Sequence, residues 1–208
     1  AGPAPDVLRV AELGAVAQLL LTAYGGYAGG ADDFAADNSA DFNTVGAGSG
    51  LGRVTTQVLL DAGHRVALAG RRPESLAETA GAHPNALIVP TDITDAASVR
   101  ALFAEAVAKF GRIDALFNNA GVFGPASSVE DIDDEQWQQT WRTNVDGALF
   151  CSREAVRAMS AQLPRGGRII NNGSLSAHRP RPRSVAYAVT KHAINGLTAS
   201  MLLDLREI

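Results

Sequence analysis

The sequence predicts an α/β fold, a doubly wound parallel sheet with helices on both faces. Two observations support this prediction. From residue 44 onward, short β-branched or apolar runs alternate with segments whose apolar residues recur at helical spacing, a pattern typical of strands alternating with helices. In addition, 46% of the 208 residues are hydrophobic, so the chain can bury a core as one domain.

The expected strands are the short β-branched or apolar runs. They cover residues 42–45, 65–69, 86–89, 113–117 and 168–171. The first run contains the polar Asn43, so we expect a strand with a weakly specified register or low stability.

Helices are expected between these strands. Three of them cover 51–62, 74–80 and 96–110, and each stops at a glycine, at position 63, 81 or 111. A long fourth helix is expected from about residue 134 to residue 162, before Pro164 and Gly166. Because ligands bind beyond the carboxyl ends of the strands in such sheets, we look for chemistry at the strand-to-helix junctions.

Residues 1–40 differ from the rest and are treated as a separate N-terminal unit, followed by the domain 41–208. Apolar residues between positions 7 and 23 follow helical spacing, and the Gly-rich, acidic stretch 25–41 is typical of a linker. We hypothesise that this helix covers apolar surface of the following domain or belongs to a fusion junction. Neither a secretory signal nor a membrane span is expected here.

Composition excludes several classes of partner. The net charge of −4 gives no basic surface for nucleic acid or an anionic membrane. The single cysteine, Cys151, has no partner for an internal disulfide and is expected to be packed inside a helix, so a reducing, cytoplasmic location is favoured. The four histidines show no spacing typical of a metal site.

A glycine-rich loop follows the first expected strand. Gly46, Gly50 and Gly52 fit the pattern G-x-x-x-G-x-G at a strand-to-helix junction. Glycines there allow a tight turn, a close approach of backbone N–H groups to a phosphate, and close helix packing. The alternative is a flexible turn without a ligand.

The end of the second expected strand indicates which dinucleotide would fit. The chain carries Arg71 and Arg72 there, where a protein that binds NAD carries an acid for the ribose hydroxyls. Two guanidinium groups could pair with a 2′-phosphate, so NADP is favoured over NAD. The alternative is that both arginines are ordinary surface charges.

Tyr187 and Lys191 lie four residues apart in a helical stretch and therefore share one helix face. A tyrosine hydroxyl is a poor base at neutral pH, but a cation about 5 Å away favours the phenolate by about 3 kcal/mol at an effective dielectric of about 20. Ser174, thirteen positions before Tyr187, could hold a carbonyl or alcohol oxygen beside the tyrosine. Lys191 is one of only two lysines among 18 basic residues.

Taken together, these residues resemble the short-chain dehydrogenase/reductase family. The resemblance rests on the glycine pattern, Asp92, the run Asn118-Asn119-Ala120-Gly121, Asn144, Ser174, and Tyr187-x-x-x-Lys191, in this order. It implies a Rossmann-type sheet that binds NADP or NAD and an oxidoreductase that transfers a hydride between the cofactor and a small secondary alcohol or ketone. It also implies a homodimer or homotetramer, whose surface commonly includes the helices around Asn144 and Tyr187.

The resemblance assigns roles to individual residues. Tyr187 would be the acid/base, Ser174 would orient the substrate oxygen, Lys191 would bind the nicotinamide ribose and favour ionisation of the tyrosine, and Asn144 would hold a water in the proton relay. The cofactor-binding residues it implies are Gly46, Ser49, Gly50, Leu51, Gly52, Arg71, Asp92, Ile93, Asn118, Ala120 and Gly121, together with Tyr187 and Lys191.

The sequence also departs from the family. Val45 precedes the first glycine where the family usually has Thr, and the chain stops at Ile208, where family members continue through further strands. We therefore expect an open edge at the strand 168–171. The alternative function is a catalytically silent NAD(P)-binding scaffold, sensor or truncated fragment.

Two features near Ser174 suggest other functions and are interpreted differently. The basic run 179–183 is short and lies between Ser174 and Tyr187, which favours a loop at the rim of the active cleft over a nucleic-acid site. His178 near Ser174 does not indicate a hydrolase triad, because no nucleophile elbow surrounds the serine.

Overall fold

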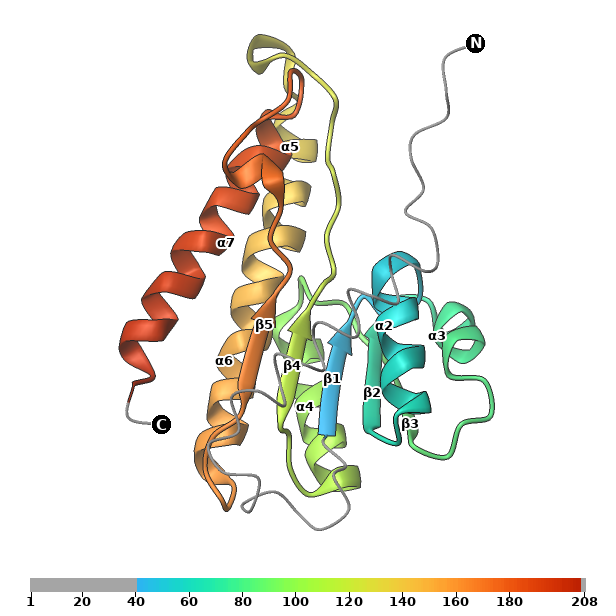
Figure 1. Ribbon diagram of the computed structural model, residues 1–208. Helices are drawn as coiled ribbons and strands as arrows, with labels where there is room; N and C mark the ends of the chain where they lie inside the picture. Colours follow the sequence, from blue (N-terminus) through green and yellow to red (C-terminus); the bar gives the residue numbers. More distant parts are fainter. Residues whose placement is uncertain (1–40, 207–208) are drawn as a thin grey trace.

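The computed structural model describes residues 41–206 and shows a five-stranded parallel sheet between two layers of helices (Figure 1). The strands are β1 (Asp41–Val45), β2 (Arg65–Gly70), β3 (Ala86–Pro90), β4 (Ala115–Asn118) and β5 (Arg168–Asn171), in the order β3-β2-β1-β4-β5. The α-helices are α2 (Gly50–Asp61), α3 (Pro73–Ala80), α4 (Ala96–Phe110), α5 (Asp134–Trp141), α6 (Gly147–Ala161) and α7 (Val185–Asp204). The predicted Rossmann-type α/β class is confirmed. The helix and linker expected within residues 1–40 lie outside the described residues.

β1 lies at the centre of the sheet, although its sequence favours a weakly specified strand. It pairs with β2 on one side, where Thr44 lies opposite Leu68, and with β4 on the other, where Thr44 lies opposite Phe117. All five of its residues are buried. Backbone pairing on both sides fixes the register of β1, so the low strand preference of Asn43 is overridden by its context.

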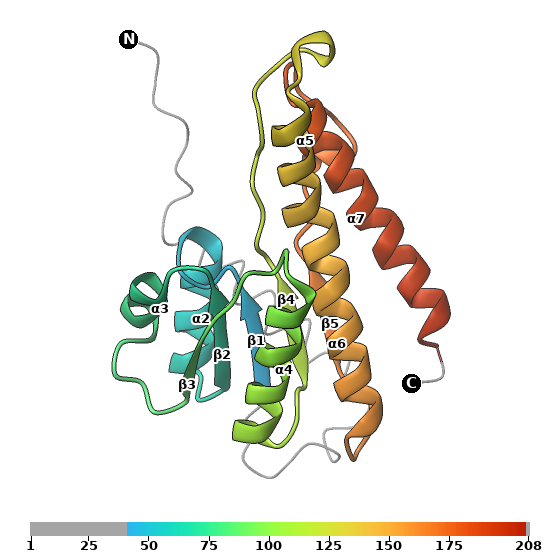
Figure 2. The same cartoon turned by 180° about the vertical axis from the view of Figure 1, so that it is seen from behind.

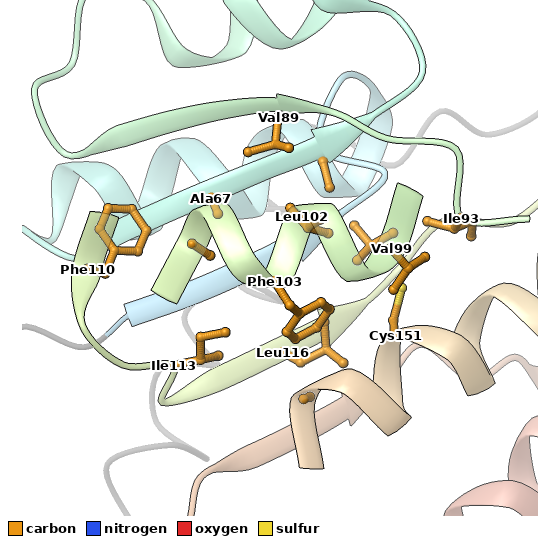
Figure 3. Close-up of a cluster of buried hydrophobic side chains, with 14 of the residues drawn as sticks. Ala67, Val89, Ile93, Val99, Leu102, Phe103, Phe110, Ile113, Leu116 and Cys151 are labelled. Atoms are coloured by element: carbon orange, nitrogen blue, oxygen red, sulfur yellow. The ribbon is translucent and has the colours of Figure 1, made fainter. Parts of the chain in front are cut away.

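The helices form one layer on each face of the sheet (Figure 2). Leu59 of α2 and Leu76 of α3 pack on one face, and α4 and α6 cover the other. Figure 3 shows Val99, Leu102 and Phe103 of α4 in the second layer.

Cys151 of α6 packs beside Val99 in this second layer (Figure 3) and is fully buried, as its sequence context predicts. Burial raises the pKa of its thiol to about 12. Because the thiolate is the reactive form, Cys151 is a packing residue.

The long helix expected over 134–162 is interrupted. α5 and α6 are joined by η2 (Arg142–Asp146), a π-helical turn in which each N–H bonds one residue further back than in an α-helix. Asn144 lies in this turn and is buried. A π-turn adds one residue to a single helical turn, and the continuous helix expected from the sequence did not allow for that residue.

Ion pairs link the strands at the amino edge of the sheet, where the strands begin. The carboxylate of Asp41 pairs with Arg65 at 2.6 Å, and Arg112 pairs with Asp114 at 2.7 Å. The backbone N–H of Asp41 donates to the carboxylate of Asp114 at 2.9 Å, which joins the two pairs. Despite these partners, burial raises the pKa of Asp41 to about 6.

The carboxyl edge is open. The segment between β4 and α5 and the segment between β5 and α7 project together beyond the strand ends (Figures 1 and 2). Each contains one 3₁₀ turn, η1 (Val129–Asp131) and η3 (Leu175–Ala177). Within the described residues, β5 pairs with β4 alone, as expected for an edge strand. Among residues 41–206, no helix is both long enough and apolar enough to cross a membrane.

Candidate active site

A cleft of about 350 Å³ opens at the carboxyl ends of β1 to β4. Its walls include seven of the residues that the sequence assigns to the cofactor: Gly46, Ser49, Arg71, Asp92, Ile93, Ala120 and Gly121. These residues come from four different strand ends, and the parallel sheet brings them together.

Two glycines determine how closely the loop packs at this cleft. Gly46 has a φ of +77°, in the left-handed region, and a Cβ there would lie 2.9 Å from the Cα of Ala120. Gly52 lies in the first turn of α2, and its Cβ would meet the carbonyl oxygen of Gly46 and the amide of Asn119. The helix therefore packs against the loop at a distance that only glycine permits.

Other predicted cofactor residues do not line the cleft. Gly50, Leu51 and Gly52 begin α2 beneath the loop, so their contribution there is packing and turn geometry. Asn118 is buried, and its Nδ2 donates to the Oγ of Ser152 at 3.0 Å on the α6 face. Asn118 is therefore not among the residues that line this cleft, whereas its neighbour Asn119 is, and the cofactor role of Asn118 stays a prediction.

The ends of β2 and β3 contribute charge and shape. Arg71 and Arg72 are exposed at the cleft, and neither forms an ion pair within residues 41–206. The Oδ1 of Asp92 accepts hydrogen bonds from the N–H and the hydroxyl of Thr94, which fixes the carboxylate at the rim. Ile93 is buried and packs so closely on Gly147 that a Cβ there would lie 2.5 Å from its Cδ1.

Four asparagines tie the ends of β4 and β5 together. The Nδ2 of Asn118 donates to the Oδ1 of Asn171 at 2.9 Å, and the Nδ2 of Asn172 donates to the Oδ1 of Asn119 at 2.9 Å. Asn119 also donates to the carbonyl of Gly46 at 3.5 Å. A polar ladder therefore runs from the glycine loop to β5.

Lys191 ends this ladder. Its Nζ donates to the carbonyl oxygen of Asn172 at 2.7 Å and lies 5.6 Å from the ring centre of Tyr187. Its side chain is buried, with 6% of the residue exposed, and burial lowers its pKa. The sequence prediction that Lys191 serves Tyr187 as a nearby cation fits this geometry.

Asn144 connects the π-turn to the tyrosine helix. Its Oδ1 accepts from the N–H of Val122 and its Nδ2 donates to the carbonyl of Val122, both at 2.8 Å. The Nδ2 also donates to the Oγ1 of Thr190, which donates to the carbonyl of Tyr187. Both amide hydrogens are thus used, and the Oδ1 keeps one acceptor position for a water, the role that the family resemblance implies.

Ser174 and Tyr187 are both half-buried, Ser174 in the segment between β5 and α7 and Tyr187 in the first turn of α7. The ring of Phe123 stacks on Tyr187 at 5.1 Å, and the guanidinium of Arg181 lies 5.8 Å from the ring centre of Phe123. Arg181 and Ser174 line a second hollow together. The Oγ of Ser174 accepts from the N–H of Ser176 at 3.1 Å, which leaves its hydroxyl hydrogen available for a substrate.

Sequence reasoning missed Asn119, Asn172, Thr190 and Phe123. Strand alternation contains the signal for Asn119: Leu116 points to the α4 and α6 layer, so Asn118 does the same and Asn119 does not. Within residues 41–206, no group of three or more His, Cys, Asp or Glu side chains could hold a metal ion.

Comparison with known proteins agrees with this geometry. The model of the short chain dehydrogenase family matches residues 43–208, which include the glycine loop, the asparagine ladder and the Tyr187–Lys191 pair. The chain belongs to this family. As a short chain dehydrogenase it is expected to share the family's site, and the residues assigned to that site above stay predictions until they are tested.

Named relatives of this chain include dehydrogenases and a reductase. The chain is 36% identical to the 3beta-hydroxysteroid dehydrogenase of Mediterraneibacter gnavus over 77% of its own length and 58% of the relative's, and 37% identical to the sorbitol dehydrogenase of Cereibacter sphaeroides over 77% and 62%. The Brucella melitensis 3-ketoacyl-(acyl-carrier-protein) reductase complexed with NADH superposes with a TM-score of 0.75 at 28% identity, covering 81% and 70% of the two chains. The chain thus spans about three fifths of the length of these curated relatives.

Proposed function

We propose that this protein transfers a hydride between NADP(H) or NAD(H) and a secondary alcohol or carbonyl group, with Tyr187 as acid/base. The observation that carries the proposal is the position of Lys191, a buried cation beside the ring of Tyr187. Lys191 also donates a hydrogen bond to Asn172, which belongs to the polar ladder that reaches the glycine loop. Burying a lysine costs free energy, so a lysine held there indicates a use for its charge.

The cleft fits the dinucleotide half of this proposal. The glycine loop leaves the space that a Cβ would fill at Gly46, and it precedes the amino end of α2, where backbone N–H groups favour a phosphate. Exposed guanidinium groups of Arg71 and Arg72 line the same cleft and favour NADP over NAD. When bound, the nicotinamide supplies or accepts the hydride.

The chain's own residues would transfer the proton and bind the substrate oxygen. In the reductive direction, the hydroxyl of Tyr187 donates its proton to the carbonyl oxygen, and in the oxidative direction the tyrosine oxygen takes the proton from the alcohol. Lys191 stabilises the resulting phenolate by its charge, and the Ser174 hydroxyl donates a hydrogen bond to the substrate oxygen. Asn144 holds Thr190, and through it the tyrosine helix, in place.

The second candidate is a silent NAD(P)-binding protein, which would use the same cofactor cleft without turnover. Absorbance at 340 nm with NADPH and a panel of ketones separates the two. We expect turnover that Tyr187→Phe lowers about 10³-fold while NADPH affinity stays within about twofold. NADPH binding without turnover in either protein would favour the silent protein, whereas equal turnover in both would contradict the role of Tyr187.

The preference for NADP has its own test. Arg71→Gln is expected to weaken NADPH binding about tenfold, because it removes a charge-assisted bond to the 2′-phosphate, and to leave NADH binding unchanged. Fluorescence titration of both cofactors against wild type and variant measures this. Tighter binding of NADH than of NADPH by the wild type would contradict the preference.

We also propose a homodimer or homotetramer formed through the helices around Asn144 and Tyr187. Leu149 of α6 and Val189 of α7 are exposed there, and Trp137 and Trp141 stack at 6.3 Å on α5. Light scattering coupled to size exclusion should give two or four copies, and Leu149→Glu should shift the mass toward one copy.

A further inference from the structure

A second hollow lies in the segment that leads to the tyrosine helix, apart from the cofactor cleft. It measures about 690 Å³ and shares no lining residue with that cleft. Its walls come from the segment between β5 and α7: Ser174, Leu175, Ser176, His178, Arg179 and Arg181. Because Ser174 is the residue proposed to hold the substrate oxygen, this hollow lies where the rest of the substrate would extend.

This hollow is basic, in a chain that is acidic overall. The sequence carries no Asp or Glu between Glu154 and Asp204, whereas the segment beside Ser174 has arginines at 179, 181 and 183. Within residues 41–206 none of these three forms an ion pair, unlike Arg65 or Arg112 at the other edge of the sheet. Their charge is therefore free to act on a ligand.

The backbone around Arg181 is fixed in place. Pro180 and Pro182 flank it and restrict the chain, and the buried Ser184 donates from its Oγ to the carbonyl of Arg181 at 2.6 Å. Arg183 adopts a φ of +58°, an uncommon conformation for a residue with a side chain. A backbone restricted in this way loses less entropy when the side chain of Arg181 binds a ligand.

A contact with Phe123 places this guanidinium one aromatic ring away from Tyr187. The guanidinium carbon of Arg181 lies 5.8 Å from the ring centre of Phe123, and the rings of Phe123 and Tyr187 stack with their centres 5.1 Å apart. Phe123 is still 42% exposed. One aromatic ring thus contacts both the cation and the tyrosine. A substrate lying along Phe123 would present its oxygen to Tyr187 and a negative group to Arg181.

We propose that the substrate carries an anionic oxygen group, a carboxylate or a phosphate, which binds Arg181 and Arg179, and that Phe123 is the apolar wall between this group and the reacting carbon. This specificity rests on the proposed dehydrogenase function. A guanidinium forms charge-assisted, bidentate hydrogen bonds with either anion, and these are stronger than its contact with an exposed ring.

Matched substrate pairs test the proposal. We compare NADPH-dependent reduction of 4-oxopentanoate with that of its methyl ester, and of dihydroxyacetone phosphate with that of dihydroxyacetone. Wild type is expected to show at least tenfold higher kcat/KM for the anionic member of one pair, and that pair identifies carboxylate or phosphate as the group. Arg181→Gln should bring the ratio near one and leave the neutral member within about twofold.

The control is Arg100→Gln, an exposed arginine on α4, which should keep the wild-type ratio. The preference should also weaken as salt concentration rises. The proposal is overturned if the neutral members react as fast as the anionic ones, or if Arg181→Gln slows both members of a pair equally.

A binding measurement separates this proposal from the proposed function. Calorimetry on the NADPH complex of Tyr187→Phe detects binding of the two anionic probes with turnover lowered about 10³-fold. At least tenfold weaker binding in the Tyr187→Phe, Arg181→Gln double variant supports the anion site, even if the wild type reduces no ketone. Equal binding of anionic and neutral probes would overturn the site, even if Tyr187 proves catalytic.

Discussion

At the amino edge of the sheet, opposite charges bind the strand ends to one another, whereas at the carboxyl edge glycines and neutral amides hold the strand ends around a cleft. The first edge contains two ion pairs, Asp41 with Arg65 and Arg112 with Asp114, which a hydrogen bond connects. Each of these charges therefore has a partner of opposite sign. At the second edge, charges such as Arg71 and Arg181 have no ion-pair partner within residues 41–206.

This difference shows that the two edges of one sheet can have different roles, one holding strand ends together and the other leaving charges available to a ligand. Paired charges are not available to a ligand, because their hydrogen bonds are already used. Amides and backbone groups position neighbours without adding net charge, so the field at the carboxyl edge is set by charged side chains such as Arg71, Arg181 and Asp92. The predictions below are ordered by their expected effect on turnover, from largest to smallest.

Replacing Gly52 should abolish activity. In Gly52→Ala the new Cβ would meet the carbonyl of Gly46 and come within 2.6 Å of the Asn119 amide, so either α2 or the loop must move. We expect a loss of at least about 3 kcal/mol in stability, together with loss of NADPH binding. Urea unfolding and fluorescence titration measure both.

The matched control is Gly196→Ala, also in a helix, where a Cβ meets no atom within 4 Å. This change should be neutral or stabilise by about 0.5–1 kcal/mol, because alanine favours helix. Similar losses in the two variants would show that close packing at the loop does not explain the requirement for glycine.

Removing the buried cation should lower turnover about 100-fold, as expected from a charge about 5 Å away at an effective dielectric of about 20. Burial lowers the pKa of Lys191, so its charge is lost at lower pH than on an exposed lysine. The wild-type kcat/KM for alcohol oxidation should therefore fall on the alkaline side as Lys191 deprotonates. Lys191→Met should lack that fall, whereas Lys109→Met, the only other lysine, should keep it.

Breaking the link between the π-turn and the tyrosine helix should have a smaller effect. Asn144→Ala leaves Val122 and Thr190 without their partner, which costs about 1–3 kcal/mol in stability, and we expect turnover to fall about tenfold. The comparison is Asn85→Ala, which removes an exposed bond to Gly63 and should change neither quantity by much. Thermal unfolding and steady-state kinetics are the measurements, and equal effects at both sites would refute a positioning role.

Changing the amino edge should leave turnover unaltered and change the pH dependence of stability. The pKa of Asp41 is about 6 in the folded protein and near 3.8 when unfolded, so between these values the folded state holds the extra proton. Stability should therefore fall as pH rises from about 4 to 6. In Asp41→Asn this fall should be reduced, as measured by urea midpoints across that range. An unchanged slope would show that Asp41 does not titrate there.

The sequence located most of the carboxyl edge because its motifs are local. Gly46 to Gly52 and the Tyr187–Lys191 pair depend on neighbours in one loop or one helix, so their spacing predicts their geometry. The helix limits at 96–110 and the strand limits at 168–171 were likewise fixed by local signals, a stop at Gly111 and a short apolar run.

What the sequence did not show depends on contacts between distant segments. β1 is central because β2 and β4 flank it, although Asn43 gives it a low strand preference. The contact of Arg181 with Phe123 joins two loops that are far apart in the chain. The π-turn at Asn144 changes hydrogen bonding without changing composition, so periodicity could not distinguish it from α-helix.

Hydrogen exchange with and without saturating NADPH tests most directly whether the carboxyl edge is the functional one. We expect the cofactor to slow exchange in residues 46–52, 71–76, 91–94 and 119–122, which form or adjoin the cleft. Exchange at the amino edge, in residues 41–43 and 112–115, should not change beyond global stabilisation. Protection confined to the amino edge, or no protection at either edge at saturating NADPH, would contradict the account.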